Sequence, residues 1–296
     1  MPVIRVRRRG LCAALALFLG LVGLFVLRRG EERGLGVLGA ASGAGRVEVP
    51  ILMYHSVLKK PFANDYVISL AALEADLAYL HQNGYQTVVV RDLIAFVEEG
   101  IPLPERPVML SFDDGHYNNY VYGQPLLKEQ GFRAVISLVG SYCEKSSESG
   151  DVNPQYSYLS WEQVRQMAGE GVFEIQNHSW NLHDNVSQRG STRGSNEPVD
   201  AYSMRLQEDL ARLQQKLAEI TGEKPAAFTF PFGKISEGES TILREMGFKA
   251  TLGCQEGVSA VERGAPESLF GLRRWLRSPG RSAESLLRAY EGKKTA

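Results

Sequence analysis

One stretch decides the fold of this chain: Val108-Met109-Leu110-Ser111-Phe112-Asp113-Asp114-Gly115. A run of apolar and β-favouring residues stops at two carboxylates and a glycine, which predicts a buried strand of a parallel sheet. Asp113 and Asp114 then lie at its C-terminal end, the edge where α/β folds place their chemistry. Adjacent acids repel, so we expect a metal ion, Arg or His nearby. A solvated turn is the alternative, because Asp and Gly are common turn residues.

The rest of the chain alternates predicted strands with predicted helices. We expect helices over residues 70–83, 92–99, 117–130, 160–169, 200–220, 239–246 and 283–290. We expect strands over residues 50–55, 87–90, 108–112, 133–139, 172–176, 227–230, 249–253 and 269–275, and polar loops over 140–156 and 183–199. This alternation predicts an α/β fold of βα units, and about 250 residues of it fit one distorted (β/α) barrel.

Composition and charge exclude some classes of partner. The chain has 296 residues and a formal net charge of -1, but residues 1–34 are basic and the remainder is mildly acidic. A body without a basic stripe argues against nucleic acid as a partner. The chain has neither a G-x-G-x-x-G motif nor a Walker loop, so a nucleotide cofactor is not indicated. The oligomeric state stays open.

The basic N-terminal end has its own explanation. Leu11 to Leu27 carries no charge and lies between two clusters of arginine. Its length is at the lower limit for a membrane span. We expect an uncleaved signal anchor with the body outside the cytoplasm, in preference to a cleaved secretory signal. The expected domains are an anchor over 1–33, a Gly- and Ala-rich flexible linker over 34–46, and a catalytic domain over 47–296.

The body of the chain contains two cysteines, Cys143 and Cys254. In an oxidising compartment they could form a disulfide, but two cysteines far apart in sequence are weak evidence for one. Two separate buried thiols are the equal alternative.

Four predicted strands end in side chains or turns that could do chemistry. In a parallel βα barrel these ends all open on one face. Two neighbouring His and one Asp supply three ligands for Zn²⁺ or a similar divalent ion and leave a position open for water. Either His taken alone would more often be structural. The four strand ends carry His55, Asp113 with Asp114, His178 with His183, and Pro231-Phe232-Gly233.

These residues resemble the motifs of the NodB-homology polysaccharide deacetylases, carbohydrate esterase family 4. Residues 111–115 match the family's T/S-F-D-D-G motif, and His178-Ser179 with His183 matches its paired-His motif with one extra residue. Pro231-Phe232-Gly233 matches R-x-P-Y/F-G without the arginine. Met53-Tyr54-His55-Ser56-Val57 resembles the Y-H-x-I/V start of the subgroup that includes poly-N-acetylglucosamine deacetylases. The resemblance covers about residues 48–291.

The resemblance implies a role for each matching residue. Asp114, His178 and His183 would hold one divalent metal ion, Zn²⁺ first, with Co²⁺ and Ni²⁺ as alternatives. Asp113 would be the general base, and His55 the general acid that protonates the departing amine.

Two further roles concern the oxyanion and the base. The resemblance implies that the backbone N–H of Phe232 helps to hold the oxyanion. The motif arginine that orients the base is missing, since Phe230 precedes Pro231. We expect Arg274 in its place, with Arg273 as the other candidate.

The chemistry of amide hydrolysis agrees with these roles. A divalent metal lowers the pKa of bound water toward about 7, which supplies a nucleophile at neutral pH. The amine is a poor leaving group, so a general acid is needed to protonate it. The expected substrate is an N-acetylhexosamine polymer, either peptidoglycan or poly-N-acetylglucosamine. An O-acetyl carbohydrate esterase and a catalytically silent carbohydrate-binding protein are the alternatives.

For three further side chains the sequence allows more than one location. Trp161 and Trp180 are equally suited to the walls of a sugar-binding groove and to the core. For His116 a surface position at a helix start is favoured over the groove.

Overall fold

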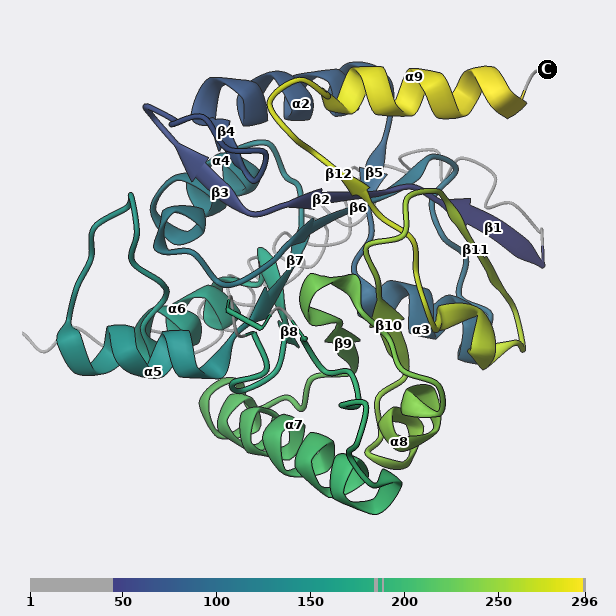
Figure 1. Cartoon of the computed structure of the whole chain (residues 1–296). Helices are drawn as coiled ribbons and strands as arrows, with labels where there is room; N and C mark the ends of the chain where they lie inside the picture. Colours follow the sequence, from purple (N-terminus) through teal and green to yellow (C-terminus); the bar gives the residue numbers. More distant parts are fainter. Residues whose placement is uncertain (1–44, 184–185, 188, 295–296) are drawn as a thin grey trace, which may run out of the picture. The chain divides into compact units, whose positions relative to one another are not determined.

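The structure is a computed structural model that describes residues 45–183, 186–187 and 189–294, and strands alternate with helices through them (Figure 1). The strands are β1 (Arg46–Val49), β2 (Ile51–Tyr54), β3 (Ser56–Leu58), β4 (Val67–Ser69), β5 (Gln86–Thr87), β6 (Pro107–Phe112), β7 (Ala134–Leu138), β8 (Phe173–Asn177), β9 (Ala227–Thr229), β10 (Ala250–Leu252), β11 (Ser259–Glu262) and β12 (Trp275–Leu276).

Helices follow most of these strands and pack around them. They are α2 (Leu70–Gln82), α3 (Val90–Glu99), α4 (Gln124–Glu129), α5 (Gly140–Ser149), α6 (Trp161–Glu170), α7 (Val199–Thr221), α8 (Glu239–Glu245) and α9 (Ala283–Lys294). Short helical segments are η1 (Asn119–Gly123), η2 (Pro231–Gly233) and η3 (Pro266–Leu269).

The main sheet is parallel and runs in the order β10-β9-β8-β7-β6-β2-β12, with β5 added beside β6. The segment before β12 also pairs with the other end of the sheet. Leu272 N donates to Thr251 O at 2.8 Å, and Gly253 N donates to Leu272 O at 2.9 Å. One segment therefore contacts both β10 and β2, so the curled sheet with its helices fits the expected distorted (β/α) barrel.

Side chains of β6 alternate between two faces of the sheet. Leu110 and Phe112 belong to the large apolar cluster that also holds buried residues of α2, α6, α7 and α9. Met109 belongs to a second cluster, which contains residues of α3. On the face of the sheet that carries Met109, the side chains closer to the C-terminal ends of the strands are polar. There Ser137 Oγ of β7 and Thr229 Oγ1 of β9 lie 2.7 Å apart. This face of the sheet is therefore polar near the C-terminal ends of the strands.

A buried ion pair fixes β12 to the helices outside the sheet. Arg277 Nε donates to Asp76 Oδ2 at 2.6 Å, and Tyr54 Oη donates to the same oxygen at 3.1 Å. Ala283 N donates to Asp76 Oδ1 at 2.9 Å at the start of α9. Asp76 therefore links α2, β2, the end of β12 and α9, and Figure 1 shows α2 and α9 side by side.

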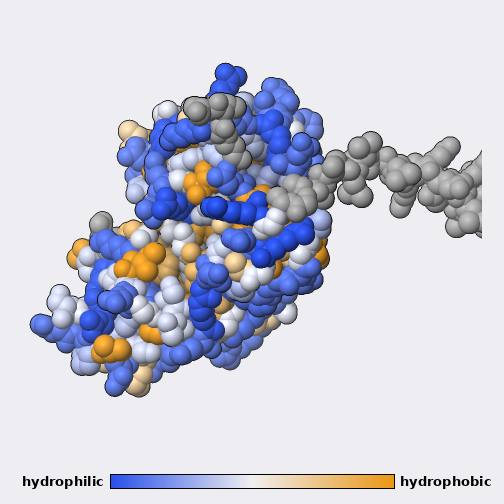
Figure 2. Space-filling view, turned by 90° about the vertical axis from the view of Figure 1, so that its right-hand side faces the viewer, coloured by the Kyte–Doolittle hydropathy of each residue, from blue (hydrophilic) through white to orange (hydrophobic). Residues whose placement is uncertain are grey.

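Apolar side chains are mostly enclosed by these layers. On the face shown in Figure 2, hydrophobic residues form small patches separated by hydrophilic ones. Within the described residues no helix combines the length and the apolar character needed to cross a membrane. The expected anchor over residues 1–33 and most of the expected linker lie outside the described residues, while β1 begins at Arg46.

Three predictions of local structure were wrong. Residues 269–275 were expected to form a strand, but Leu269 ends η3 and only Trp275 lies in a strand, β12, because Gly271 with φ of 76° interrupts the extended backbone. Residues 140–156 were expected to form a loop, but the first ten of them form α5. This helix is rich in serine and buries only Gly140, Cys143 and Ser146, so its sequence shows little apolar periodicity. Residues 87–90 were expected to be a strand, but β5 ends at Thr87 and α3 begins at Val90. Tertiary packing overrides the β propensity of the valines there.

We predict that Asp76→Ala strongly destabilises the fold. The change leaves the Arg277 guanidinium buried without its partner, and loss of one member of a buried ion pair typically costs about 3–5 kcal/mol. Urea unfolding followed by circular dichroism would measure the loss. Glu74→Ala, an exposed change on the same helix, should stay within about 0.5 kcal/mol of the parent. Equal stability of the two variants would contradict the assigned role of Asp76.

Candidate active site

One cavity of about 680 Å³ opens at the C-terminal ends of the parallel strands. Six of the seven site residues expected from the sequence line it, and the seventh, Arg274, is fully buried behind Asp113. Residues distant in sequence thus share one site. The six lining residues are His55, Asp113, Asp114, His178, His183 and Phe232.

The end of β6 turns sharply, so that both carboxylates face this cavity. Asp113 N donates to Tyr54 O at 3.0 Å and so extends the pairing of β6 with β2. Asp114 then adopts a left-handed conformation with φ of 70°, and Gly115 follows with φ of 78°. Side chains rarely adopt this φ, and a Cβ atom at Gly115 would also lie 2.7 Å from Leu138 Cδ2, so the turn favours glycine.

Left-handed backbone recurs at three strand ends around the cavity. Among the described residues, the non-glycine residues with positive φ are Asp114 after β6, Ser179 after β8 and Phe232 after β9. Such conformations cost on the order of 1–3 kcal/mol each, and they concentrate at functional sites. The three turns direct side chains of neighbouring strands into one space.

Asp114, His178 and His183 form a group that could hold a metal ion. His178 Nε2 lies 3.5 Å and His183 Nε2 lies 3.4 Å from Asp114 Oδ1, and the possible ligand atoms are all within 4.8 Å of one another. Asp114 Oδ1 is buried without a hydrogen-bond partner in the described part of the chain. The three side chains therefore suit a divalent cation that prefers nitrogen and oxygen ligands.

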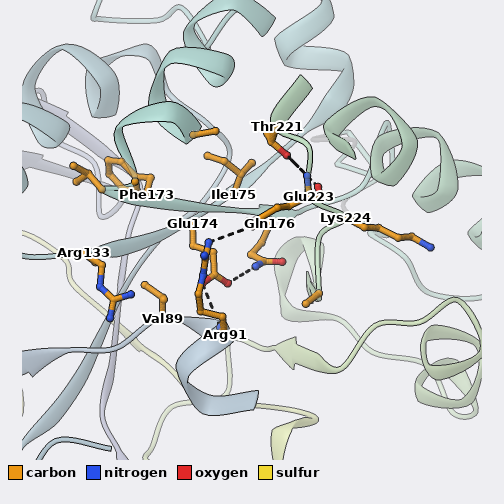
Figure 3. Close-up of a pocket in the computed structure, with 14 residues that line it drawn as sticks. Val89, Arg91, Arg133, Phe173, Glu174, Ile175, Gln176, Thr221, Glu223 and Lys224 are labelled. Atoms are coloured by element: carbon orange, nitrogen blue, oxygen red, sulfur yellow. Dashed lines mark hydrogen bonds and ion pairs between the residues drawn. The ribbon is translucent and has the colours of Figure 1, made fainter. Parts of the chain in front are cut away.

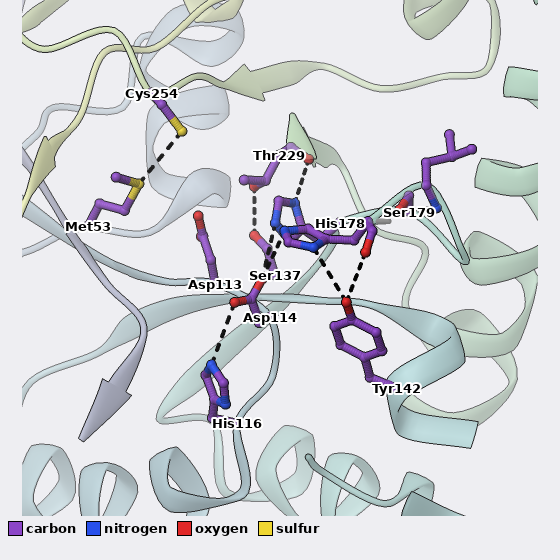
Figure 4. A network of polar contacts seen from close by, with 12 residues as sticks. Met53, Asp113, Asp114, His116, Ser137, Tyr142, His178, Ser179, Thr229 and Cys254 are labelled. Atoms are coloured by element: carbon purple, nitrogen blue, oxygen red, sulfur yellow. Dashed lines mark hydrogen bonds and ion pairs between the residues drawn. The ribbon is translucent and has the colours of Figure 1, made fainter. Parts of the chain in front are cut away.

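Hydrogen bonds and burial prepare the two imidazoles for this role. His178 Nδ1 lies 2.7 Å from Thr229 O and donates to that carbonyl, which turns Nε2 toward Asp114 (Figure 4). Burial lowers the pKa of His178, but the neighbouring carboxylates of Asp114 and Asp113 outweigh it and raise that pKa. Burial and then the neighbouring His178 lower the pKa of His183 to about 4, so His183 is neutral at pH 7. A neutral imidazole is the form that binds metal.

Asp113 forms a buried ion pair with Arg274. Arg274 Nη1 donates to Asp113 Oδ1 at 2.7 Å and to Ser111 Oγ at 2.9 Å, while Arg274 Nε donates to Gly253 O at 2.7 Å. Burial raises the pKa of Asp113, but the Arg274 guanidinium and then His178 outweigh it and hold that pKa below its usual value. Asp113 is therefore an ionised carboxylate with a fixed orientation.

His55 and Phe232 occupy other parts of the cavity wall. Burial lowers the pKa of His55, although the carboxylates of Asp114 and Asp113 oppose that shift. His55 Nδ1 is buried and unpaired as far as the described residues go. The Phe232 ring packs on His183 with 4.3 Å between ring centroids, and its backbone makes the turn after β9.

The structure separates the alternatives left open for other residues. Trp161 and Trp180 are each 8% exposed and stack on one another at 6.1 Å, so they belong to the core. Cys143 and Cys254 are both free thiols, and only Cys254 lines the cavity. His116 lines the cavity as well, although its sequence position favoured a surface location.

A second cavity, of about 240 Å³, lies near the opposite ends of the strands (Figure 3). Arg91 Nε donates to Glu174 Oε2 at 3.0 Å, and Gln176 Nε2 donates to Glu174 Oε1 at 2.6 Å. Both oxygens of this buried carboxylate thus have partners, which indicates a structural polar cluster. The chemistry of the described residues is concentrated in the larger cavity.

Comparison with known families identifies one match. The family model described as polysaccharide deacetylase matches residues 100–251, just over half of the chain. The matched region contains Asp113, Asp114, His178, His183 and Phe232, whereas His55 and Arg274 lie outside it.

Curated relatives and solved structures agree with this match. The Poly-beta-1,6-N-acetyl-D-glucosamine N-deacetylase of Escherichia coli (strain K12) is 27% identical over 214 residues, 65% of this chain. The chain spans only 31% of the length of that relative.

Two solved structures resemble the fold. IcaB from Ammonifex degensii has a TM-score of 0.65 and 27% identity, over 81% of this chain and 96% of its own. A de-N-acetylase from Aggregatibacter actinomycetemcomitans has a TM-score of 0.69 and 24% identity, over 82% of this chain and 100% of its own. At 24% identity the second match supports the fold alone.

We predict that Arg274→Met lowers the free energy of unfolding by about 3–5 kcal/mol, because it leaves Asp113 charged and buried without its partner. Thermal unfolding would measure the loss. Arg273→Met is the matched control, since Arg273 is the exposed neighbour, and should change stability by less than about 0.5 kcal/mol.

A double-mutant cycle would separate the ion pair from general packing. Asp113→Asn combined with Arg274→Met should cost less than the sum of the single changes, with a coupling of about 0.5–3 kcal/mol. Simple additivity would contradict the pairing.

Proposed function

This chain belongs to the polysaccharide deacetylase family, whose members are hydrolases, and we propose that it removes N-acetyl groups from an N-acetylhexosamine polymer. One observation carries the proposal. The ionised, buried Asp113 and the Asp114–His178–His183 group line the same cavity. That combination offers a base and a cation site side by side, as metal-assisted hydrolysis requires.

The proposed cation is held by Asp114, His178 and His183. Zn²⁺ is the first candidate, because three protein ligands with an open position are typical of catalytic zinc, and Co²⁺ and Ni²⁺ are the alternatives. When bound, such a cation supplies Lewis-acid activation of water and of the acetyl carbonyl. The rest of the proposed chemistry belongs to the side chains of the protein.

Asp113 is the proposed general base. Its carboxylate accepts the proton that the attacking water loses, and Arg274 keeps it ionised and oriented before the reaction. Ser111 Oγ accepts from the same guanidinium, which restrains Arg274 further. A positioned base of this kind contributes typically about 10²–10⁴ in rate.

His55 is the proposed general acid, and the Phe232 backbone N–H the proposed oxyanion donor. The departing amine is a poor leaving group until it is protonated, and His55 lies in the same cavity wall as Asp113. The role of Phe232 is supported by its left-handed turn after β9 and by the packing of its ring on His183, one of the proposed ligands.

The proposed polymer is of the poly-N-acetylglucosamine type, with peptidoglycan as the alternative. The name of the Escherichia coli relative supports the first, because that enzyme is a poly-beta-1,6-N-acetyl-D-glucosamine N-deacetylase.

Location is a separate proposal, which rests on the uncharged stretch from Leu11 to Leu27 between arginine clusters. We propose a single membrane anchor with the catalytic domain outside the cytoplasm. Recovery of the full chain in the soluble fraction of its host would contradict the anchor.

We predict that Asp113→Asn lowers kcat by about 10²–10⁴ while the bound metal is retained, because the change removes the base and no ligand. His55→Ala should behave in the same way. His178→Ala should lose the metal as well as activity. Acetate release and metal content, measured on each purified full-length variant, test these roles. Asp200→Asn, an exposed change on α7, is the control and should match the parent.

The substrate is tested by the same acetate assay on N-acetylated and O-acetylated oligosaccharides. We predict release from the N-acetylated poly-β-1,6-linked oligomer with added Zn²⁺ or Co²⁺. Release from O-acetylated sugars alone would replace the proposal with an esterase. Sugar binding without any acetate release would identify a silent homologue.

A further inference from the structure

His116 contacts the proposed metal ligand Asp114 from a different side than the two ligand histidines. His116 Nε2 lies 3.5 Å from Asp114 Oδ2 (Figure 4). His178 and His183 instead approach Asp114 Oδ1. The two oxygens of one carboxylate thus have separate neighbours. At 3.5 Å, the contact between His116 Nε2 and Asp114 Oδ2 is longer than a usual hydrogen bond.

The His116 ring is itself held in place. It stacks on Tyr158, with 5.0 Å between ring centroids and 21° between planes, and the two residues also form an antiparallel backbone bridge. On either side of the bridge, Leu159 N donates to Gly115 O and Tyr117 N donates to Ser157 O, both at 2.9 Å. A ring fixed in this way keeps Nε2 directed at Asp114.

The same aromatic row reaches the second histidine ligand. Tyr158 packs on Tyr142 with 4.3 Å between centroids, and Tyr142 Oη donates to His183 O at 2.9 Å. Tyr142 lies on α5, the helix that the sequence did not predict. The row of His116, Tyr158 and Tyr142 therefore supports one side of the metal group, from Asp114 to His183.

We propose that His116 is a positioning residue that holds Asp114 Oδ2, so that Oδ1 is left to bind the cation. This inference rests on the proposed function, because it assumes the same cation site. His116 acts through Asp114 and is not itself a ligand, since the group of possible ligand atoms is formed by Asp114, His178 and His183. Partners that orient a metal ligand typically contribute about 10–100-fold to metal affinity.

Two substitutions separate the N–H group from the stacked ring. His116→Phe keeps a ring against Tyr158 but has no N–H to donate, whereas His116→Gln keeps an N–H donor without the ring. The matched control is His81→Phe, at an exposed histidine of α2 remote from the cavity lining. The reference for a lost ligand is His178→Ala.

The experiment measures the affinity of each full-length protein for Zn²⁺ by competition with a chromophoric chelator, and the visible absorption spectrum of the Co²⁺ form. We expect His116→Phe to weaken Zn²⁺ binding about 10–100-fold and to shift the Co²⁺ bands. His116→Gln should recover at least half of that loss on a logarithmic scale, and His81→Phe should match the parent. Circular dichroism confirms that each variant is folded.

Other outcomes overturn either this inference or the proposed function on which it rests. Unchanged Zn²⁺ affinity and Co²⁺ bands in His116→Phe would show that His116 does not position Asp114. Loss as complete as in His178→Ala would make His116 a direct ligand. A parent protein that binds no Zn²⁺, or a His178→Ala variant that binds it normally, would instead refute the cation site of the proposed function.

Discussion

The buried pair of Asp113 and Arg274 is the constraint on which the rest of the site depends. A carboxylate removed from water costs several kcal/mol unless a partner compensates it. Arg274 supplies that compensation from the segment that joins β10 to β12, and its Nε also donates to Gly253 O. The segment that links the two ends of the sheet is therefore also the one that keeps Asp113 ionised.

The short strand β12 is anchored from both sides by buried charge. Arg274 precedes it and reaches Asp113 in the cavity wall, while Arg277 follows it and reaches Asp76 on α2. Two residues of strand pairing alone would hold such a segment weakly. The two ion pairs couple the geometry of the site to the packing of the outer helices, because both act on one short element.

Particular elements show how much of the fold and of the site could be predicted from the sequence. The apolar run before Asp113 and the paired histidines predicted the parallel strands, the family and the residues that meet in the cavity, because strand ends of a βα fold share one face. Helix α5 was missed, since serine-rich sequence without apolar periodicity carries no helical signal. Because α5 was missed, the position of Tyr142 on it could not be predicted. The stacking partners of His116 could not be predicted either, because stacking between distant residues leaves no local pattern in the sequence.

The sequence by itself determined the alternation of the main parallel strands with helices, the family resemblance and the residue types at the strand ends that line the cavity. Local patterns record which residues are apolar, charged or able to turn, and these properties act over a few positions. The resemblance already favoured Arg274 over Arg273, but only the tertiary structure shows that Arg274 meets Asp113 while Arg273 is exposed. It also decided that His116 faces Asp114 and that the two tryptophans pack in the core. These contacts join segments far apart in the chain, so the folding of the whole sheet was needed to bring them together.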